Sequence, residues 1–272
     1  MRILLTNDDG VLSPVLHTTA EALAREHEVV VAAPAHDQSG TSHSFTHGVG
    51  RLLTAHRETA PGAHDYPVHR IDGTPSDCVK FAVAHLLKDA PPDLVVSGPN
   101  LGENAGISAV YSGTVAAARE GALWNLPALA VSLSDHGPAQ LAYALEWLLG
   151  LLRKPDLLPA PGSFWNINFP ACAPDQVAGA RFAAMSTAMF RDHYETVQTE
   201  HDIPGYQLRG HKPAELFVPG TDDDVLRRNF IAVTPLRVSQ GDEAALALLK
   251  QRESRLNESP GVAALAAPAP TF

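Results

Sequence analysis

Two adjacent carboxylates near the start of the chain are the strongest chemical signal in the sequence. Asp8 and Asp9 directly follow a short apolar run, Arg2–Thr6, which is typical of a buried strand. Neighbouring carboxylates repel each other unless a cation or a proton lies close to them, and hard divalent ions prefer carboxylate oxygens as ligands. The pair therefore indicates a metal site. The alternative is an Asp-Gly turn in which one carboxylate caps the following helix.

Two polar loops, each following an apolar run, carry further side-chain oxygens. Ser39 follows the predicted strand Glu28–Ala33, and Asn100 follows the predicted strand Asp93–Ser97 in a long loop that also contains Asn104. Taken singly, each of these side chains is an ordinary loop residue.

The run Ser112-Gly113-Thr114 stands at the start of a predicted helix, Thr114–Asn125. It offers hydroxyl groups, the unpaired N–H groups of a first helical turn and the positive end of the helix dipole, which are the elements of a phosphate site. We expect this run, together with Asn104, to bind phosphate. The alternative is that Ser112 or Thr114 only caps the helix.

The elements that position these loops alternate between strand and helix along most of the chain. This order predicts an α/β fold with a mostly parallel sheet, right-handed crossovers and helices on its faces. Thr74 and Asp77 also predict a capping box at one helix start. The predicted strands are Arg2–Thr6, Glu28–Ala33, Asp93–Ser97, Ala128–Leu133, Phe164–Phe169 and Phe230–Val238, with short strands or a hairpin within 51–72. The predicted helices are Leu12–Glu26, Thr74–Lys88, Thr114–Asn125, Gln140–Arg153 and Asp242–Leu256.

The four polar loops should meet at one edge of this sheet, because ligands of open parallel sheets bind at the carboxyl ends of the strands. There they supply two carboxylates, neutral oxygens and a helix start. The sequence contains neither GxGxxG nor GxxxxGK[ST], which disfavours a dinucleotide or P-loop nucleotide site. The convergence of the loops indicates a metal-dependent phosphatase.

Composition restricts the partners. The 272-residue chain carries a formal net charge of −10, which repels a polyanionic backbone, so we expect no long nucleic acid to bind. Its two cysteines, Cys78 and Cys172, suit a reducing cytoplasm better than a disulfide framework. No apolar run reaches the ~20 residues that span a bilayer, and the first residues lack the features of a signal peptide. We therefore expect a cytoplasmic protein that does not bind membranes.

The strand–helix alternation weakens after about residue 185. We predict a catalytic core over 1–185, an extended β-hairpin or arm over 186–228, a return strand and helix over 229–258, and a poorly ordered tail over 259–272. Within the arm, Asp222-Asp223-Asp224 is interpreted as a solvated acidic turn, with a cation site as the alternative.

These motifs, in this order, resemble the SurE family of 5′/3′-nucleotidases, the survival protein family. The resemblance covers nearly all of the chain up to about residue 240, while the segment 190–228 follows the family less closely. The matching segments are Ile3–Gly10, Ala33-Pro34, Gln38-Ser39-Gly40, Gly73–Val79, Pro92–Asn100, Tyr111–Gly121, Leu126–Leu133, Asn166–Pro170 and Ile231–Leu236.

The resemblance implies a Rossmann-like core, an arm that exchanges between subunits, and a homodimer or homotetramer. It implies hydrolysis of nucleoside 5′- and 3′-monophosphates to nucleoside and phosphate, as by a 5′-nucleotidase. Some family members also act on short polyphosphate. The family's metal ligands map onto Asp8, Asp9, Ser39 and Asn100, which would hold one divalent ion per subunit: Mg²⁺ or Mn²⁺, with Ca²⁺ as a further candidate.

Two mechanisms fit these groups. In the first, a metal-activated water attacks the phosphorus, with Asp8 or Asp9 as base. In the second, one of the two aspartates attacks directly and forms an aspartyl-phosphate. His43 and His47 are candidate general acids near Ser39, although solvated loop histidines are the alternative.

Two other functions compete with this interpretation. One is a metal-dependent transferase that uses nucleotide diphosphates, which the release of free phosphate from a monophosphate would exclude. The other is an inactive nucleotide-binding module. The presence of both aspartates together with Ser39 and Asn100 argues against that module.

Overall fold

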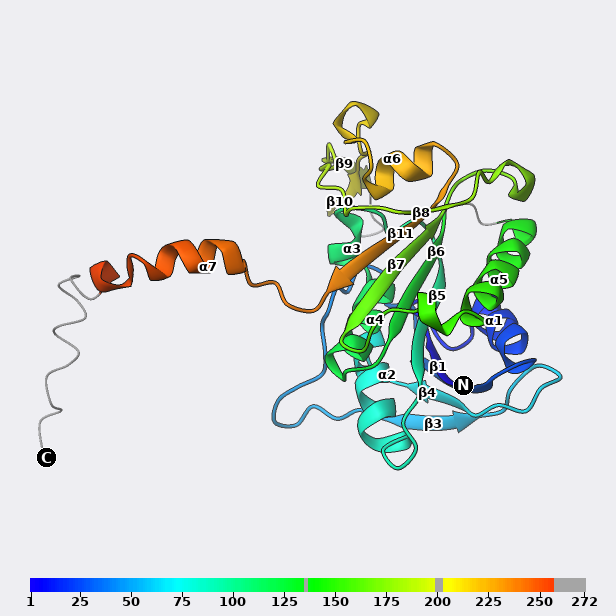
Figure 1. Ribbon diagram of the computed structural model, residues 1–272. Helices are drawn as coiled ribbons and strands as arrows, with labels where there is room; N and C mark the ends of the chain where they lie inside the picture. Colours follow the sequence, from blue (N-terminus) through cyan, green and yellow to red (C-terminus); the bar gives the residue numbers. More distant parts are fainter. Residues whose placement is uncertain (135–136, 199–202, 257–272) are drawn as a thin grey trace, which may run out of the picture. The chain divides into compact units, whose positions relative to one another are not determined.

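Within the part of the chain that the structure describes, nine strands form one mixed sheet that carries the polar loops at one edge (Figure 1). The computed structural model describes residues 1–134, 137–198 and 203–256. The strand order is β3-β4-β2-β1-β5-β6-β7-β11-β8, and a separate two-stranded sheet pairs β9 with β10. The strands are β1 Arg2–Thr6, β2 Glu28–Pro34, β3 Ala55–Glu58, β4 Val68–Ile71, β5 Leu94–Leu101, β6 Ala128–Leu133, β7 Ser163–Phe169, β8 Ala180–Phe182, β9 His193–Gln198, β10 Pro204–Arg209 and β11 Ile231–Arg237. The predicted α/β fold with a mostly parallel sheet is confirmed, since β4, β2, β1, β5, β6 and β7 run parallel.

Helices cover both faces of this sheet. The α-helices are α1 Pro14–Ala24, α2 Pro75–Phe81, α3 Ser108–Tyr111, α4 Gly113–Leu123, α5 Pro138–Leu152, α6 Asp222–Arg227 and α7 Glu243–Lys250. Alternate residues of β1 serve the two faces: Ile3 and Leu5 share a buried cluster with α1 and α5, whereas Leu4 packs with α2 and α4. None of these helices, within the described residues, is long and apolar enough to cross a membrane.

The chain changes direction along the sheet at β1. The β1–α1–β2 unit places β2 on one side of β1, while β5 pairs with the other side. Such a switch point leaves a crevice beyond the carboxyl ends of the strands, where ligands of open α/β sheets bind. Asp8 and Asp9 follow β1 and therefore lie at this point of the sheet.

Most predicted elements are confirmed with shifts at their ends. The pairing of β3 with β4 provides the expected hairpin within 51–72. At the start of α2, the Thr74 side chain accepts from the Asp77 amide and the Asp77 side chain accepts from the Thr74 amide, as in the predicted capping box. The helix predicted to reach Lys88 leaves α geometry earlier and continues as a π-helix over Ala82–Leu86. Sequence reasoning missed α3, α6 and β8, which span six residues or fewer.

The segment after β8 contains the predicted hairpin, β9 and β10, paired antiparallel from His193↔Arg209 to Gln198↔Pro204. Figure 1 shows this hairpin and α6 beyond the end of the main sheet. Residues Met1–Val238 form one compact unit, and α7 belongs to a second. The boundaries predicted at 185, 228 and 258 stay predictions, and the tail over 259–272 lies outside the described residues.

The interpretation of Asp222-Asp223-Asp224 as a solvated turn is wrong. All three side chains are buried in the first turn of α6. Asp222 accepts hydrogen bonds from the amides of Gly106, at 2.8 Å, and Ser186, at 2.9 Å. Buried carboxylates persist where backbone donors and cations satisfy them, and the sequence alone does not reveal such partners.

Candidate active site

A cavity of about 710 Å³ lies at the carboxyl ends of β1, β2 and β5. Six of the eight predicted site residues line it: Asp8, Asp9, Ser39, Asn100, Asn104 and Ser112. Gly113 and Thr114 are buried directly behind Asp8 and are not among the described residues that line the cavity. The predicted convergence of the loops is thus seen in the structure.

Thr114 fixes the carboxylate of Asp8. Its amide donates to Asp8 Oδ2 at 3.1 Å, and its hydroxyl donates a short hydrogen bond to Asp8 Oδ1. Burial raises the pKa of Asp8, although both hydrogen bonds from Thr114 favour the charged form. The first turn of α4 therefore directs two of its donors to a carboxylate, and a direct contact of Thr114 with phosphate stays a prediction.

The junction between α3 and α4 needs its particular small residues. Ser112 caps α4 by accepting from the Val115 amide at 3.1 Å. A Cβ atom on Gly113 would lie 2.9 Å from the Cβ of Asp8, closer than side-chain carbons approach each other. Gly113 thereby lets the helix start approach Asp8. The capping alternative is correct for Ser112, which also lines the cavity, so capping and phosphate binding are compatible there.

The loop after β2 is tied to the loop after β1. The Gln38 amide donates to the Asp8 carbonyl at 2.8 Å. Within the loop, Asp37 Oδ1 accepts from the Ser39 amide at 2.7 Å and from its hydroxyl at 2.6 Å. These bonds lower the pKa of Asp37. The two hydrogen bonds to Asp37 hold Ser39 beside the two aspartates. Because the hydroxyl proton of Ser39 is donated to Asp37, the lone pairs of its oxygen are available to a cation.

Asn100 lies within β5 rather than in the loop that the sequence predicts. The strand passes an irregularity between Ser97 and Asn100 and resumes its pairing with β6 at Asn100↔Ser132. The side-chain amide of Asn100 donates to the Gly102 carbonyl at 2.7 Å, which makes Oδ1 the ligand atom. Pairing of this strand end with β6 positions the oxygen more rigidly than a free loop would.

Asn104 is held by three hydrogen bonds. Its amide N–H donates to Asn168 Oδ1 at 2.7 Å, its side chain donates to Ser132 Oγ at 2.8 Å, and its carbonyl accepts from Asn166 Nδ2 at 2.8 Å. The two buried asparagines of β7 therefore support the site, a role that sequence reasoning missed. The sequence predicted a half-buried strand here and so gave no sign that both asparagines are buried, where amides require partners.

Comparison with known proteins agrees with this arrangement. The family model "Survival protein SurE" matches residues 3–192. The chain belongs to the SurE family. A 5′-nucleotidase SurE of Solidesulfovibrio magneticus is 38% identical over 257 residues, covering 93% of this chain and 97% of the relative. The 5′-nucleotidase SurE 1 of Thermus thermophilus is 40% identical over 239 residues, covering 87% and 91%. The crystal structure of the SurE protein from Aquifex aeolicus superposes with a TM-score of 0.77 at 27% identity, covering 93% of this chain and all of that one.

The candidate metal-ligand residues share one cavity. Asp8, Asp9, Ser39 and Asn100 line it, and each has a side-chain oxygen. Among the described residues, no group of three or more His, Cys, Asp and Glu is arranged to hold a metal. Oxygen ligands favour Mg²⁺, Mn²⁺ or Ca²⁺ over zinc.

The two candidate histidines do not line this cavity. His43 Nε2 lies 2.9 Å from Glu120 Oε2, on a buried carboxylate that also accepts from Lys80 Nζ at 2.7 Å and Trp124 Nε1 at 2.9 Å. His43 is therefore neither a solvated loop histidine nor placed as a general acid. It anchors the Ser39 loop to α2 and α4. His47 lies further along this loop, beside the ring of Phe45.

The Glu120 cluster should contribute stability that depends on pH. Burial acts to raise the pKa of Glu120, but its hydrogen bonds with His43 and Lys80 outweigh burial and lower it. A lowered folded-state pKa stabilises the protein above the unfolded pKa of about 4.3, and this gain is lost as pH falls through the folded value. Glu120→Gln should therefore cost about 1–3 kcal/mol near pH 7 in urea unfolding, and less below about pH 4. Glu58→Gln, in an exposed pair with Arg70, is the control and should change stability by less than about 0.5 kcal/mol. Equal effects of the two substitutions would contradict the assignment.

Sequence reasoning also missed the part of the cavity contributed by the arm. Met189, Phe190, Asp192, Leu208, Arg209 and Gly210 line it beside the metal-ligand candidates. These residues lie more than 80 positions after Asn100, and no local pattern in the sequence connects them to the first loops.

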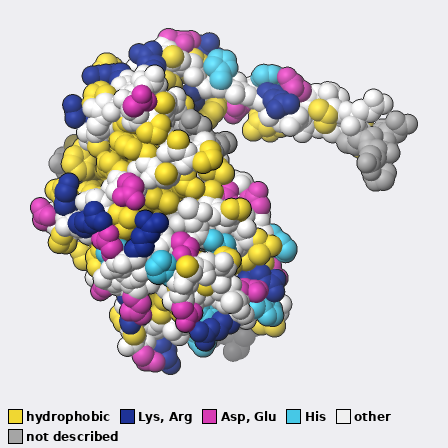
Figure 2. All heavy atoms as spheres, turned by 90° about the vertical axis from the view of Figure 1, so that its right-hand side faces the viewer, with side chains coloured by type: hydrophobic (Ala, Val, Ile, Leu, Met, Phe, Trp, Pro, Cys, Tyr) yellow, Lys and Arg dark blue, Asp and Glu magenta, His cyan; other side chains and the backbone are white. Residues whose placement is uncertain are grey.

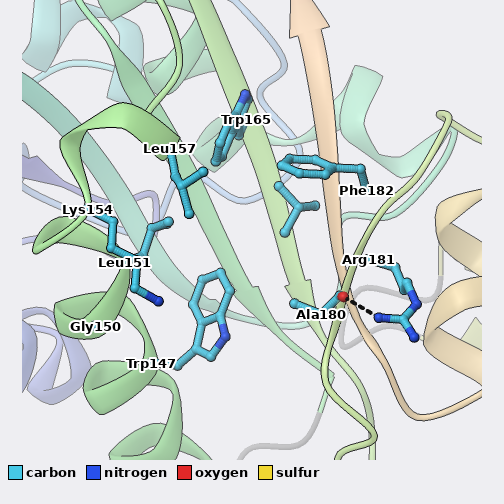
Figure 3. A pocket seen from close by; sticks show the side chains of 10 residues that line it. Trp147, Gly150, Leu151, Lys154, Leu157, Trp165, Ala180, Arg181 and Phe182 are labelled. Carbon is cyan, nitrogen blue, oxygen red and sulfur yellow. Dashed lines mark hydrogen bonds between the residues drawn. The ribbon is translucent and has the colours of Figure 1, made fainter.

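A second cavity, of about 350 Å³, differs in its chemistry. Figure 3 shows Trp147 and Leu151 of α5 and Trp165 of β7 among its lining side chains, with Lys154 and Arg181 as the charged residues. Figure 2 shows hydrophobic side chains gathered on the face that lies to the right in Figure 1. None of the described residues that line this cavity is a carboxylate, in contrast to the cavity at Asp8 and Asp9.

Proposed function

We propose that this protein is a divalent-metal-dependent 5′-nucleotidase that hydrolyses nucleoside monophosphates to nucleoside and phosphate. The observation that carries the proposal is the convergence of Asp8, Asp9, Ser39 and Asn100 on one cavity in a chain of the SurE family. Relatives that align over most of this chain are named 5′-nucleotidases, which supports the same activity here.

One divalent cation per subunit would be held by Asp8 Oδ, Asp9 Oδ, Ser39 Oγ and Asn100 Oδ1. When bound, it would polarise the phosphoryl group and lower the pKa of a coordinated water. Mg²⁺ and Mn²⁺ are the preferred candidates, with Ca²⁺ as a third.

The residues of the chain divide the remaining tasks. Asp8 holds its position through Thr114 and is almost fully buried, which suits a fixed ligand. Asp9 is half-buried and is the carboxylate that we propose as base for the attacking water. Ser112 and the backbone at Gly113 lie next to Asp8 and would bind the phosphate oxygens through the start of α4. Water adds to phosphorus, the P–O bond to the sugar breaks, and the leaving oxygen takes a proton from solvent.

We propose that the protein hydrolyses both 5′- and 3′-nucleoside monophosphates, and that it acts in the cytoplasm as a homodimer or homotetramer. A direct attack by Asp9, with an aspartyl-phosphate as intermediate, is the mechanistic alternative.

Removing the metal should abolish activity. We expect phosphate release from 5′- and 3′-nucleoside monophosphates with added Mn²⁺ or Mg²⁺, and a loss of at least about a hundredfold in EDTA, because the cation would supply the positive charge directly beside the phosphoryl group. The measurement is a phosphate assay across the substrates, with metal added back after EDTA as the control. Full activity in EDTA would refute the metal assignment. The absence of release from every substrate would favour the inactive binding module.

A further inference from the structure

The cavity that contains the metal ligands has a second, apolar surface. Beside the polar residues, six large apolar side chains line it: Leu101, Ile107, Tyr111, Met189, Phe190 and Leu208. Hydrophobic side chains left at the surface around a cavity commonly mark a ligand site. Tyr111 is 56% exposed and Met189 is 55% exposed, so a bound ligand could cover much of both.

Tyr111 stands directly beside the proposed phosphate site. It is the last residue of α3 and immediately precedes Ser112, which caps α4 and lines the same cavity. A ligand whose phosphate lies at Ser112 would therefore bring its adjoining atoms close to the tyrosine ring. The main-chain carbonyl of Tyr111 accepts from the Ser42 amide at 2.9 Å, and this contact does not involve the ring.

Phe190 belongs to the arm and lines the cavity, and its ring is in contact with a buried lysine. Lys212 Nζ lies 5.5 Å from the centre of its ring. The Lys212 side chain is only 6% exposed, pairs with Asp223 and donates to the Ala105 carbonyl at 3.1 Å. Because the lysine is fixed by these buried partners, the phenylalanine ring has a firm support.

The volume and polar groups of the cavity suit more than a phosphate. About 710 Å³ lies within the range of sites that enclose a whole small-molecule ligand. Arg209 and Asp192 of the arm add a hydrogen-bond donor and an acceptor to the lining. Arg209 is oriented by Glu195, at 3.1 Å, and by Gln207, at 2.9 Å.

We propose that Tyr111 and Phe190 form a nucleobase-binding wall, against which the base of the substrate stacks while its phosphate lies at Asp8 and Asp9. This inference rests on the proposed function and identifies residues that determine specificity for it. Every base has a π-face, so such a wall favours nucleotides over other phosphomonoesters without selecting one base.

The test compares two substrates that differ only in the base. For adenosine 5′-monophosphate and ribose 5-phosphate, kcat/KM is measured in wild type, Tyr111→Ala, Phe190→Ala and Tyr111→Phe, with Mn²⁺ present. The preference for the nucleotide should fall about 10- to 100-fold in either alanine variant, the range for loss of one base–aromatic stack, mainly through KM. Tyr111→Phe should retain the preference. Tyr206→Ala is the control, because Tyr206 is an exposed aromatic of β10 outside the described lining.

A binding measurement separates this inference from the proposed function. Calorimetric titration with adenosine, which has no phosphate to hydrolyse, should show weaker binding in the alanine variants than in wild type and Tyr206→Ala. If wild type releases no phosphate but binds adenosine through Tyr111 and Phe190, the proposed function is wrong and the base-binding role of these residues is supported. An unchanged preference for adenosine 5′-monophosphate over ribose 5-phosphate in the alanine variants, or equal losses on both substrates, would refute this role.

Discussion

Replacing Asp8 by asparagine should lower kcat/KM for nucleoside monophosphates by about a thousandfold or more. The substitution keeps the shape of the side chain and an oxygen for Thr114, but it removes one of the two negative charges of the proposed site. Loss of that charge weakens the binding of the cation. It thereby also weakens the stabilisation of the charge that develops during phosphoryl transfer. The measurement is phosphate release at saturating Mn²⁺.

Stability measurements show whether this loss is one of chemistry or of folding. Burial raises the pKa of Asp8, which means that the charged form is disfavoured in the metal-free protein. A neutral isostere should therefore leave the metal-free unfolding midpoint unchanged or higher. Added Mn²⁺ should raise the midpoint of wild type but hardly that of Asp8→Asn, because only a ligand that binds the folded state stabilises it. Asp89→Asn, on an exposed turn, is the control. A stable variant that keeps both its activity and its response to Mn²⁺ would remove Asp8 from the site.

Gly98→Ala should destabilise the protein by more than about 2 kcal/mol and also weaken metal binding. Gly98 has a φ of +106°, and an added Cβ would lie 2.3 Å from the Val131 carbonyl oxygen and 2.9 Å from the Asn100 amide nitrogen. Both neighbours are backbone atoms, so the contact with Val131 can be relieved only by moving β5 away from β6, and the contact with Asn100 only by changing the backbone of β5 itself. That movement would displace Asn100. Urea unfolding and Mn²⁺ titration measure the two effects.

Two other glycines separate the contributions of conformation and contact. Gly40 has a φ of +73°, and no atom lies within 4 Å of an added Cβ. Gly40→Ala should therefore cost only about 1–2 kcal/mol of stability, the cost of holding alanine in a left-handed backbone conformation. Gly150 lies inside α5 with nothing within 4 Å, and Gly150→Ala should stabilise the protein by about 0.5–1 kcal/mol. If Gly98→Ala cost no more than Gly40→Ala, the close approach to Val131 would be unimportant.

The elements that carry strong local patterns were predictable. The strand Arg2–Thr6 and the strand Ala128–Leu133 have the bounds that their apolar runs predict, because strands buried on both faces consist almost wholly of apolar residues. The meeting of Asp8, Ser39 and Asn100 followed from one topological rule, that the carboxyl ends of parallel strands share an edge.

The features that escaped prediction depend on partners distant in sequence. Gly98-Pro99 suggests a loop, yet β5 continues through it because β6 offers backbone partners at Ser132. The acidic run of α6 suggests a solvated surface, yet Asp222 is buried because Gly106 and Ser186 supply it with amides. Phe190 lines the cavity because the arm lies beyond the strand ends that Asp8, Ser39 and Asn100 follow or occupy.

The two bonds of Asp222 also bear on how substrates enter. One carboxylate joins Gly106, which leads into α3, to Ser186, which leads into the arm. A hinge motion that moved the arm away from α3 would break the hydrogen bond from the Gly106 amide to this buried carboxylate, at a cost of about 1–3 kcal/mol. Access should therefore depend on rotamer changes of rim side chains such as Tyr111 and Met189, on a timescale of nanoseconds rather than that of a domain movement. The cavity of the enzyme would then stay open to solvent at all times.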